Sequence, residues 1–335
     1  MVCVRDLLAC PVCGGDVTEQ WSCTLCDRQY LAENEIPNLR MSSDPRVEAV
    51  RKFYEDAPFP GYPPNDSLTW LRARAARSPF ARLLDQAIPC DARIVEIGCG
   101  TGQMSLFLAR AERIVVGADL TRASLKLGAD AARRFGLDRV QFVETDLTLP
   151  GLKDGAFDIV YAAGVLHHLP DPRSGFDRIV RLVRPGGRII VGLYNSYARL
   201  PLRLRRLIAR TTDYRFIPFD PVLSDRMSEP ERRRAWLRDQ YQHPEEHHFT
   251  LGEVQQWFVE NGIRYLRSYP SATIGDDCED LFTQSEDNWQ FEGWLAQIGW
   301  MHTIGKEGGL FMTIGEREAS PARQEVERDE LHATN

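Results

Sequence analysis

The sequence predicts an α/β fold in which a doubly wound, mostly parallel sheet follows a small cysteine-rich module. From residue 93 onward, strand-like apolar runs alternate with helical patterns, which indicates parallel βαβ units. Before residue 40, cysteines occur as two Cys-x-x-Cys pairs, which is the spacing of a metal-bound module. The 335 residues exceed one typical domain, so both parts fit in one chain.

The expected strands lie in regular order along the central part of the chain, at 93–97, 113–118, 140–144, 157–162 and 188–193. Right-handed crossovers place the connecting helices on both faces of such a sheet, and ligands then bind at the carboxyl ends of the strands. One of these helices is expected to begin at Ser174, with Asp177 completing a capping box. A further helix is predicted over 67–88.

Near the end of the fold, Thr250 and Glu253 predict a second capping box. The strands that follow are expected at 263–269 and 309–314. The expected domain plan is a metal module, a connector with its helix, a catalytic α/β domain interrupted by two insertions, and a disordered acidic tail. Their ranges are 1–40, 41–90, 91–315 with insertions 195–249 and 270–308, and 316–335.

A glycine-rich turn follows the first strand of the α/β domain, in the order Glu96-Ile97-Gly98-Cys99-Gly100-Thr101-Gly102. Glycine accepts positive φ and allows the backbone to approach a ligand closely. A dinucleotide-binding turn would place its third glycine one residue later. The segment instead resembles the first motif of the class I S-adenosylmethionine (SAM)-dependent methyltransferases, whose Rossmann-like seven-stranded sheet ends with an antiparallel strand.

This resemblance implies where SAM binds. Asp119, at the tip of the second strand, is expected to accept hydrogen bonds from the ribose hydroxyls, with a helix N-cap as the alternative. Asp146 matches the acidic residue that lies near the adenine amino group in this family. Without the other motifs, it would be interpreted as a turn residue. The full expected cofactor set is Glu96, Gly98, Gly100, Gly102, Asp119, Leu120, Asp146, Leu147 and Gly164.

Histidines supply the candidate acid–base groups. His167 and His168 follow the fourth strand, where a packing or orienting role is favoured over a general-base role. The segment 239–248 holds three more histidines, and we expect His243 and His247 to recognise the acceptor or act as general base. A metal site that includes Glu246 and a simple hydrogen-bonded surface loop are the alternatives.

The two cysteine pairs are Cys10 with Cys13 and Cys23 with Cys26. Four thiolates leave no open coordination position, so a structural zinc ion is expected. The segment resembles the small zinc ribbons of the Trm112-like type, found beside methyltransferases. Contact with RNA, a protein partner and homodimerisation through the ribbon remain open at this point.

Two further segments have open roles. Arg199, Arg203, Arg206 and Arg210 recur at helical spacing, with leucines on the opposite face. A lid helix with a solvated basic face is favoured, and contact with RNA, an anionic membrane or an acidic substrate is the alternative. In the connector, the rings of Tyr54, Phe59 and Tyr62 either anchor the chain or line the cofactor pocket.

Charge and hydropathy narrow the function. The formal net charge is −7, which does not favour a nucleic-acid partner. Neither a membrane-spanning run nor a signal-peptide pattern is visible, so a cytoplasmic protein is expected. The expected activity is in-line methyl transfer from SAM to a small-molecule acceptor. RNA methylation guided by the ribbon and a non-catalytic SAM-binding scaffold are the alternatives.

Overall fold

The computed structural model describes most of the chain, and the structural statements below refer to that part. The described residues are 4–41, 44–56, 58, 60–63, 65–220, 222–224, 230–243, 245–273, 275–276, 278–285 and 290–319. The expected acidic tail lies outside this part from residue 320 onward, and so does Phe59 of the connector.

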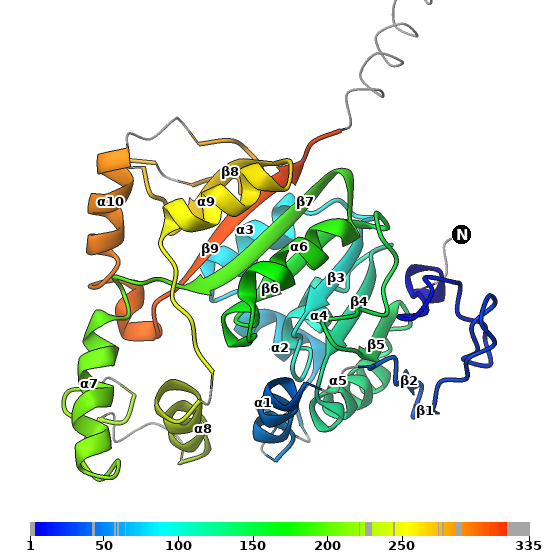
Figure 1. Ribbon diagram of the computed structural model, residues 1–335, viewed down its shortest axis with the longest axis horizontal. Coiled ribbons are helices and arrows are strands. Elements are labelled where there is room, and N and C mark those ends of the chain that lie inside the picture. Colours follow the sequence, from blue (N-terminus) through cyan, green and yellow to red (C-terminus); the bar gives the residue numbers. More distant parts are fainter. Residues whose placement is uncertain are drawn as a thin grey trace, which may run out of the picture.

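The central sheet has seven strands in the order β5-β4-β3-β6-β7-β9-β8 (Figure 1). All neighbouring pairs are parallel except those that involve β9, which is antiparallel to β7 and β8. The predicted doubly wound α/β fold is therefore confirmed, including the antiparallel last strand. The strands are β3 (Arg93–Ile97), β4 (Ile114–Asp119), β5 (Val140–Glu144), β6 (Phe157–Ala163), β7 (Val183–Tyr194), β8 (Ile263–Tyr269) and β9 (Leu310–Arg317).

Helices cover both faces of the sheet because consecutive side chains of each strand point to opposite sides. Val95 of β3 packs in a core with Phe176 and Phe258, which come from two helices on one face. Its neighbour Ile94 packs in a second core with residues of helices on the other face. The α-helices are α1 (Pro45–Glu55), α2 (Leu68–Ala75), α3 (Pro79–Ala87), α4 (Gln103–Leu108), α5 (Arg122–Phe135), α6 (Pro172–Leu182), α7 (Leu200–Thr211), α8 (Pro230–Tyr241), α9 (Leu251–Glu260) and α10 (Gln290–Gly299).

Two local predictions about helices were wrong. The helix expected over 67–88 is broken into α2 and α3, because Pro79 has no N–H to continue a helix and instead begins a new one after the N-cap Ser78. The helix α6 begins before Ser174, since the Asp171 carboxylate accepts the Ser174 N–H and serves as N-cap. The capping box of Thr250 and Glu253 at α9 is confirmed.

The cysteine-rich module lies beside the β5 edge of the sheet and consists of turns with one short hairpin, β1 (Ala32–Glu33) and β2 (Ile36–Pro37) (Figure 1). Leu7, Leu8 and Leu39 are almost completely buried in the core that they share with β3 and β4. Backbone hydrogen bonds join Leu39 to Glu144 and Ala9 to Gly151. The module therefore packs into the α/β domain and shares its core.

Within the two predicted insertions, the structure forms α7 and α8 in 195–249 and α10 in 270–308. The expected connector contains α1. No helix among the described residues is both long and apolar enough to span a bilayer.

Candidate active site

A cavity of about 970 Å³, counting its open mouth, lies at the carboxyl ends of β3, β4 and β6. Its walls come from the glycine turn after β3, the tips of β4 and β5, the segment after β6, and one face of α1. This is the edge at which a doubly wound sheet binds its ligands. The lining residues used below are Tyr54, Gly98, Gly100, Asp119, Leu120, Asp146, Leu147, Gly164 and His168.

Two glycines of the turn line the cavity. Gly98 has φ +66°, and a Cβ there would lie 2.6 Å from the Val165 side chain. Gly100 has φ +54°, and its N–H donates to the Asp119 carboxylate at 2.7 Å. Positive φ is strained for any other residue type, so the sequence folds into this tight turn because these residues are glycines.

Asp119 lies at the tip of β4 and faces the cavity. One carboxylate oxygen accepts the Gly100 N–H, and the other accepts both the N–H and the hydroxyl of Thr121. Burial raises the pKa of this carboxyl group. The N-cap position of α5 belongs to Thr121, so the alternative reading of Asp119 as the helix N-cap was wrong.

Asp146 is 2% exposed and has one unused acceptor. Its Oδ1 accepts the Thr148 N–H at 2.8 Å, whereas its buried Oδ2 has no hydrogen-bond partner among the described residues. A buried polar atom without a partner is costly, so a ligand N–H in the cavity would relieve that cost. On the opposite wall, Gly164 has φ +78°, and a Cβ there would meet nothing within 4 Å.

Glu96 and Gly102 are the first and last residues of the glycine turn. Both were expected to bind the cofactor, but neither lines the cavity. Glu96 accepts a hydrogen bond from the Ser105 hydroxyl of α4, and burial raises the pKa of its carboxyl group to about 7. Gly102 lies against Phe142, whose ring would be 2.5 Å from an added Cβ. Their expected contacts with the cofactor remain predictions.

At the other end of the cavity, two stacked histidines are held by one residue. The rings of His168 and His243 lie 3.7 Å apart, and only His168 lines the cavity. The Glu245 carbonyl oxygen is 2.8 Å from Nδ1 of His168, and the Glu245 N–H donates to Nδ1 of His243 at 3.1 Å. A carbonyl only accepts, so Nδ1 of His168 carries the hydrogen and the neutral ring keeps its lone pair on Nε2.

Burial keeps these rings neutral. It lowers the pKa of His168, lowers that of His243 to about 3, and lowers that of the fully buried His167 well below its usual range. The ring of His167 packs on Tyr194, with 3.8 Å between centroids, and neither of its nitrogens has a partner among the described residues. Its surroundings fit the packing role predicted for it.

His247 lies outside this cluster. It is absent from the cavity lining, its side chain is 37% exposed, and its Nε2 lies 3.2 Å from Glu245. Of the two histidines expected to be catalytic, His243 packs against the cavity wall and His247 does not. The alternative metal site with Glu246 was wrong, because among the described residues only the four cysteines gather closely enough to hold an ion.

Glu246 instead joins two arginines of the first insertion. Its carboxylate binds Arg199 at 2.6 Å and Arg206 at 2.5 Å, and it lies 2.6 Å from Nε2 of His248. Although burial opposes it, the hydrogen bond with His248 and these two charges hold the pKa of Glu246 well below its usual range. Residues 245–248 are thereby held against α7.

The sequence did not predict the helix α1, which forms one wall of the cavity, called the roof below. Val47, Val50 and Tyr54 of α1 line it, although the connector carried no helical prediction there. The Tyr54 hydroxyl donates to the Asp239 carboxylate of α8 at 2.9 Å. Tyr54 therefore lines the pocket, whereas Tyr62 anchors the connector by donating to the Thr101 carbonyl at 2.8 Å. The capping pattern Asp44-Pro45 was the signal that could have revealed α1.

Residues 95–191 match the family model described as a methyltransferase domain. This segment contains the glycine turn, Asp119, Asp146 and His168. This segment is a methyltransferase domain. A demethylmenaquinone methyltransferase of Clavibacter sepedonicus is 38% identical over 38% of this chain and 47% of its own length.

Two other relatives and one solved structure show how far the similarity reaches. A ubiquinone biosynthesis O-methyltransferase of Paracidovorax citrulli is 33% identical over 32% of this chain and 45% of its own length, so the chain spans about half the length of these named methyltransferases. An uncharacterized Synechococcus protein is 27% identical over 79% of this chain and 72% of its own length. Geranyl diphosphate C-methyltransferase from Streptomyces coelicolor covers 83% of this chain and 100% of its own at 15% identity, with a TM-score of 0.49.

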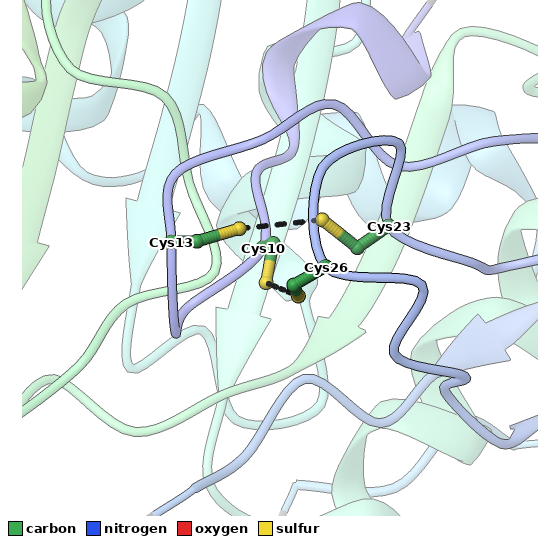
Figure 2. Close-up of side chains that lie close together, drawn as sticks. All are labelled: Cys10, Cys13, Cys23 and Cys26. Atoms are coloured by element: carbon green, nitrogen blue, oxygen red, sulfur yellow. Dashed lines mark hydrogen bonds between the residues drawn. The ribbon is translucent and has the colours of Figure 1, made fainter.

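The methyltransferase domain carries the cysteine module at its β5 edge. Figure 2 shows the sulfur atoms of Cys10, Cys13, Cys23 and Cys26 pointing toward one another. The sulfurs of Cys10 and Cys26 are 3.7 Å apart, those of Cys13 and Cys23 are 3.4 Å apart, and all four lie within 4.8 Å of one another. Zn–S bonds of about 2.3 Å in a tetrahedron place sulfurs about 3.8 Å apart, so the four thiols fit a zinc ion.

Proposed function

We propose that this protein transfers the methyl group of SAM to a hydroxyl group of a small molecule, with His168 as the general base. The observation that carries the proposal is one cavity with a donor site at one end and a neutral, oriented imidazole at the other. In this reaction the acceptor oxygen attacks the methyl carbon, the sulfur–carbon bond breaks to leave S-adenosylhomocysteine (SAH), and the acceptor proton moves to Nε2 of His168.

At the donor end, several groups of this chain are suited to bind SAM. The unpartnered Oδ2 of Asp146 suits the adenine amino group, and the Asp119 carboxylate suits the ribose hydroxyls. Gly98, Gly100 and Gly164 allow the cofactor to approach the backbone, while Leu120 and Leu147 offer apolar surface. SAM supplies the electrophilic methyl group when bound.

The acceptor end supports the general-base role of His168. Its lowered pKa leaves the ring unprotonated at neutral pH, and its bond to the Glu245 carbonyl directs the lone pair to Nε2. The stacked His243 has the opposite tautomer, because its Nδ1 accepts the Glu245 N–H. We assign His243 to holding His168 in place, and we assign no catalytic step to the exposed His247.

The small-molecule acceptor is supported by the relatives, because two of them are named for quinone methylation. RNA methylation is less well supported. The module over 4–41 carries three arginines and six acidic residues, and a zinc tetrathiolate would add further negative charge. Phosphate backbones need basic surface, so this module is a poor RNA platform.

We further propose that the four cysteines bind a structural zinc ion in a ribbon of the Trm112-like type. Their closed tetrahedral set has no position left for substrate. The ribbon packs on the sheet edge next to the loop that carries Asp146, so its expected role is to support the donor site rather than to do chemistry.

The first test of the proposed activity uses methyl-labelled SAM with the full-length protein and a fractionated cell extract. Label in the small-molecule fraction supports the proposal, and label only in RNA overturns it. Binding of SAH without turnover in every fraction would indicate a scaffold and would also overturn it.

The second test changes His168 to Asn, with His302→Asn as an exposed control. Asparagine retains an N–H donor for the Glu245 carbonyl and removes the Nε2 base. We expect kcat with the active fraction to fall about 100-fold or more, with SAH affinity unchanged. A kcat equal to that of the control would refute the role of His168.

A further inference from the structure

The helix α7 is turned opposite to the orientation expected from its sequence. Four of its large apolar side chains face outward, with Leu204 65%, Leu207 64%, Ile208 41% and Leu200 40% exposed, whereas Leu202 is buried. The prediction of a solvated basic face was therefore only partly right, because Arg203 and Arg210 are exposed but Arg199 and Arg206 face inward. Large apolar side chains in a row on one exposed face are uncommon in a folded domain and mark an interaction surface.

The reason for this orientation is the acid that the helix covers. Arg199 is completely buried, with its guanidinium 3.6 Å from the centre of the Tyr194 ring, and both Arg199 and Arg206 bind Glu246. A buried carboxylate needs such partners, so the two arginines must face inward. Because the leucines occupy the opposite side of the helix, they remain on the surface.

Two large apolar side chains in the sequence after α7 are exposed as well. Phe216 is 59% exposed and Phe219 is 91% exposed, in the segment that follows the helix. We call the six side chains Leu200, Leu204, Leu207, Ile208, Phe216 and Phe219 the α7 face. Figure 1 shows α7 at the lower left, standing away from the sheet and on the opposite side of the molecule from the ribbon.

Basic residues surround the α7 face. Arg203, Arg210 and Arg215 are exposed beside its apolar side chains. Residues 199–215 contain six arginines, of which Arg199 and Arg206 pair with Glu246, and one acidic residue, Asp213, although the whole chain has a net charge of −7. Positive charge is thus concentrated where the apolar side chains are exposed.

We propose that the α7 face docks on an anionic lipid bilayer. Exposed leucines and phenylalanines flanked by arginines match both the acyl region and the negative headgroups of such a surface. RNA would satisfy the arginines but leave the leucines in water. A second copy of this face would cover the leucines but oppose arginine to arginine. Docking is independent of the methyl-transfer proposal and concerns where the enzyme acts.

The test is flotation of the full-length protein with phosphatidylcholine vesicles, with and without 30% phosphatidylglycerol. We expect flotation with the anionic vesicles and much less with phosphatidylcholine alone. The double variant Leu204→Gln/Leu207→Gln should reduce the partition coefficient about tenfold or more, because each exposed leucine loses its transfer into the acyl region. The control Leu31→Gln changes a leucine on the ribbon that is still more exposed, at 79%, and should float like the wild type.

Two other measurements keep the proposal falsifiable. SAH affinity of the double variant should equal that of the wild type, which excludes unfolding as the cause of lost flotation. No flotation of the wild type with anionic vesicles, or equal flotation of the double variant, overturns the proposal. A dimer in solution that the double variant dissociates, or RNA binding that Arg203→Gln/Arg210→Gln abolishes without any lipid binding, would instead assign the face to a second copy or to RNA.

Discussion

The donor end and the acceptor end of the cavity are built differently. Gly98, Asp119 and Asp146 lie in short turns at the tips of neighbouring strands, and backbone geometry positions them. At the acceptor end, Tyr54 and Asp239 are 185 residues apart in sequence, and His168 and Glu245 are 77 apart. In the proposed site, cofactor binding thus depends on local turns, whereas acceptor binding depends on long-range packing of α1, α8 and residues 245–248.

The ribbon belongs to the donor end. The Leu39 N–H donates to the Glu144 carbonyl immediately before the loop that carries Asp146, and the Ala9 N–H donates to the Gly151 carbonyl after it. The Lys153 N–H also donates to the Leu7 carbonyl. Both ends of this loop are therefore attached to segments adjoining the cysteine site. If the cysteines bind zinc and the cavity binds SAM, as proposed, this arrangement couples the metal to the cofactor without any shared ligand.

The largest effect is expected at Asp119. The change Asp119→Ala removes the acceptor for the Gly100 and Thr121 N–H groups as well as the proposed ribose contact. We expect the Kd for SAH to rise about 100-fold or more, measured by calorimetry, since charged hydrogen bonds and their unpaired partners are lost. Asp138→Ala is a control on the exposed surface. An unchanged Kd in Asp119→Ala would remove this residue from the cofactor site.

Removal of the metal should weaken SAH binding by a smaller factor than Asp119→Ala does. In Cys26→Ser the zinc content should fall, and the Kd for SAH should rise about tenfold because the loop of Asp146 loses its support. Cys90→Ser, at an exposed cysteine outside the cluster, is the matched control. A metal-free Cys26→Ser protein that binds SAH like the wild type would show that the ribbon and the cofactor site are uncoupled.

The same contrast explains what the sequence could predict. The strands, the glycine turn and the positions of Asp119 and Asp146 follow from contiguous patterns, and the structure contains each of them where expected. The cysteine cluster could also be predicted from the sequence, because the spacing of metal ligands is local. In each case the responsible signal spans fewer than about twenty residues.

The acceptor end could not be predicted in this way. The orientation of α7 depends on Glu246, which lies 47 residues from Arg199, and helical periodicity alone favoured the opposite face. The role of His168 rests on its contact with Glu245, which no spacing pattern reveals. Periodicity predicts which residues share a face, whereas the buried partner decides which face points inward.

The acceptor end should also make the protein sensitive to acid. The pKa of His243 is lowered from 6.5 to about 3, so below pH 6.5 the unfolded chain binds a proton that the folded chain does not, and stability is lost as the pH falls. His243→Asn keeps an acceptor for the Glu245 N–H and cannot be protonated. Relative to its value at pH 8, the free energy of unfolding at pH 5.5 should fall by about 1 kcal/mol less in the variant than in the wild type.

Denaturant unfolding at the two pH values measures this difference, with the exposed His302→Asn as control. Because the comparison is between proteins that share all other titrating groups, the raised pKa of Glu96 contributes equally to both. Parallel pH profiles for the wild type and His243→Asn would indicate that His243 has the same pKa in the folded and unfolded states, and would contradict the buried, neutral cluster.

The smallest effect is expected at the roof of the cavity, where Tyr54→Phe removes one hydrogen bond, from α1 to Asp239. Asp239 keeps the Gln240 amide at 2.6 Å, so the loss should be only about 0.5–1.5 kcal/mol. If α1 and α8 form the acceptor end, this loss appears as a several-fold rise in KM for the acceptor, with the Kd for SAH unchanged. Tyr54 also lines the shared cavity. A rise in the Kd for SAH equal to the rise in KM would therefore place α1 in the donor site, and the two ends would no longer be separate sites.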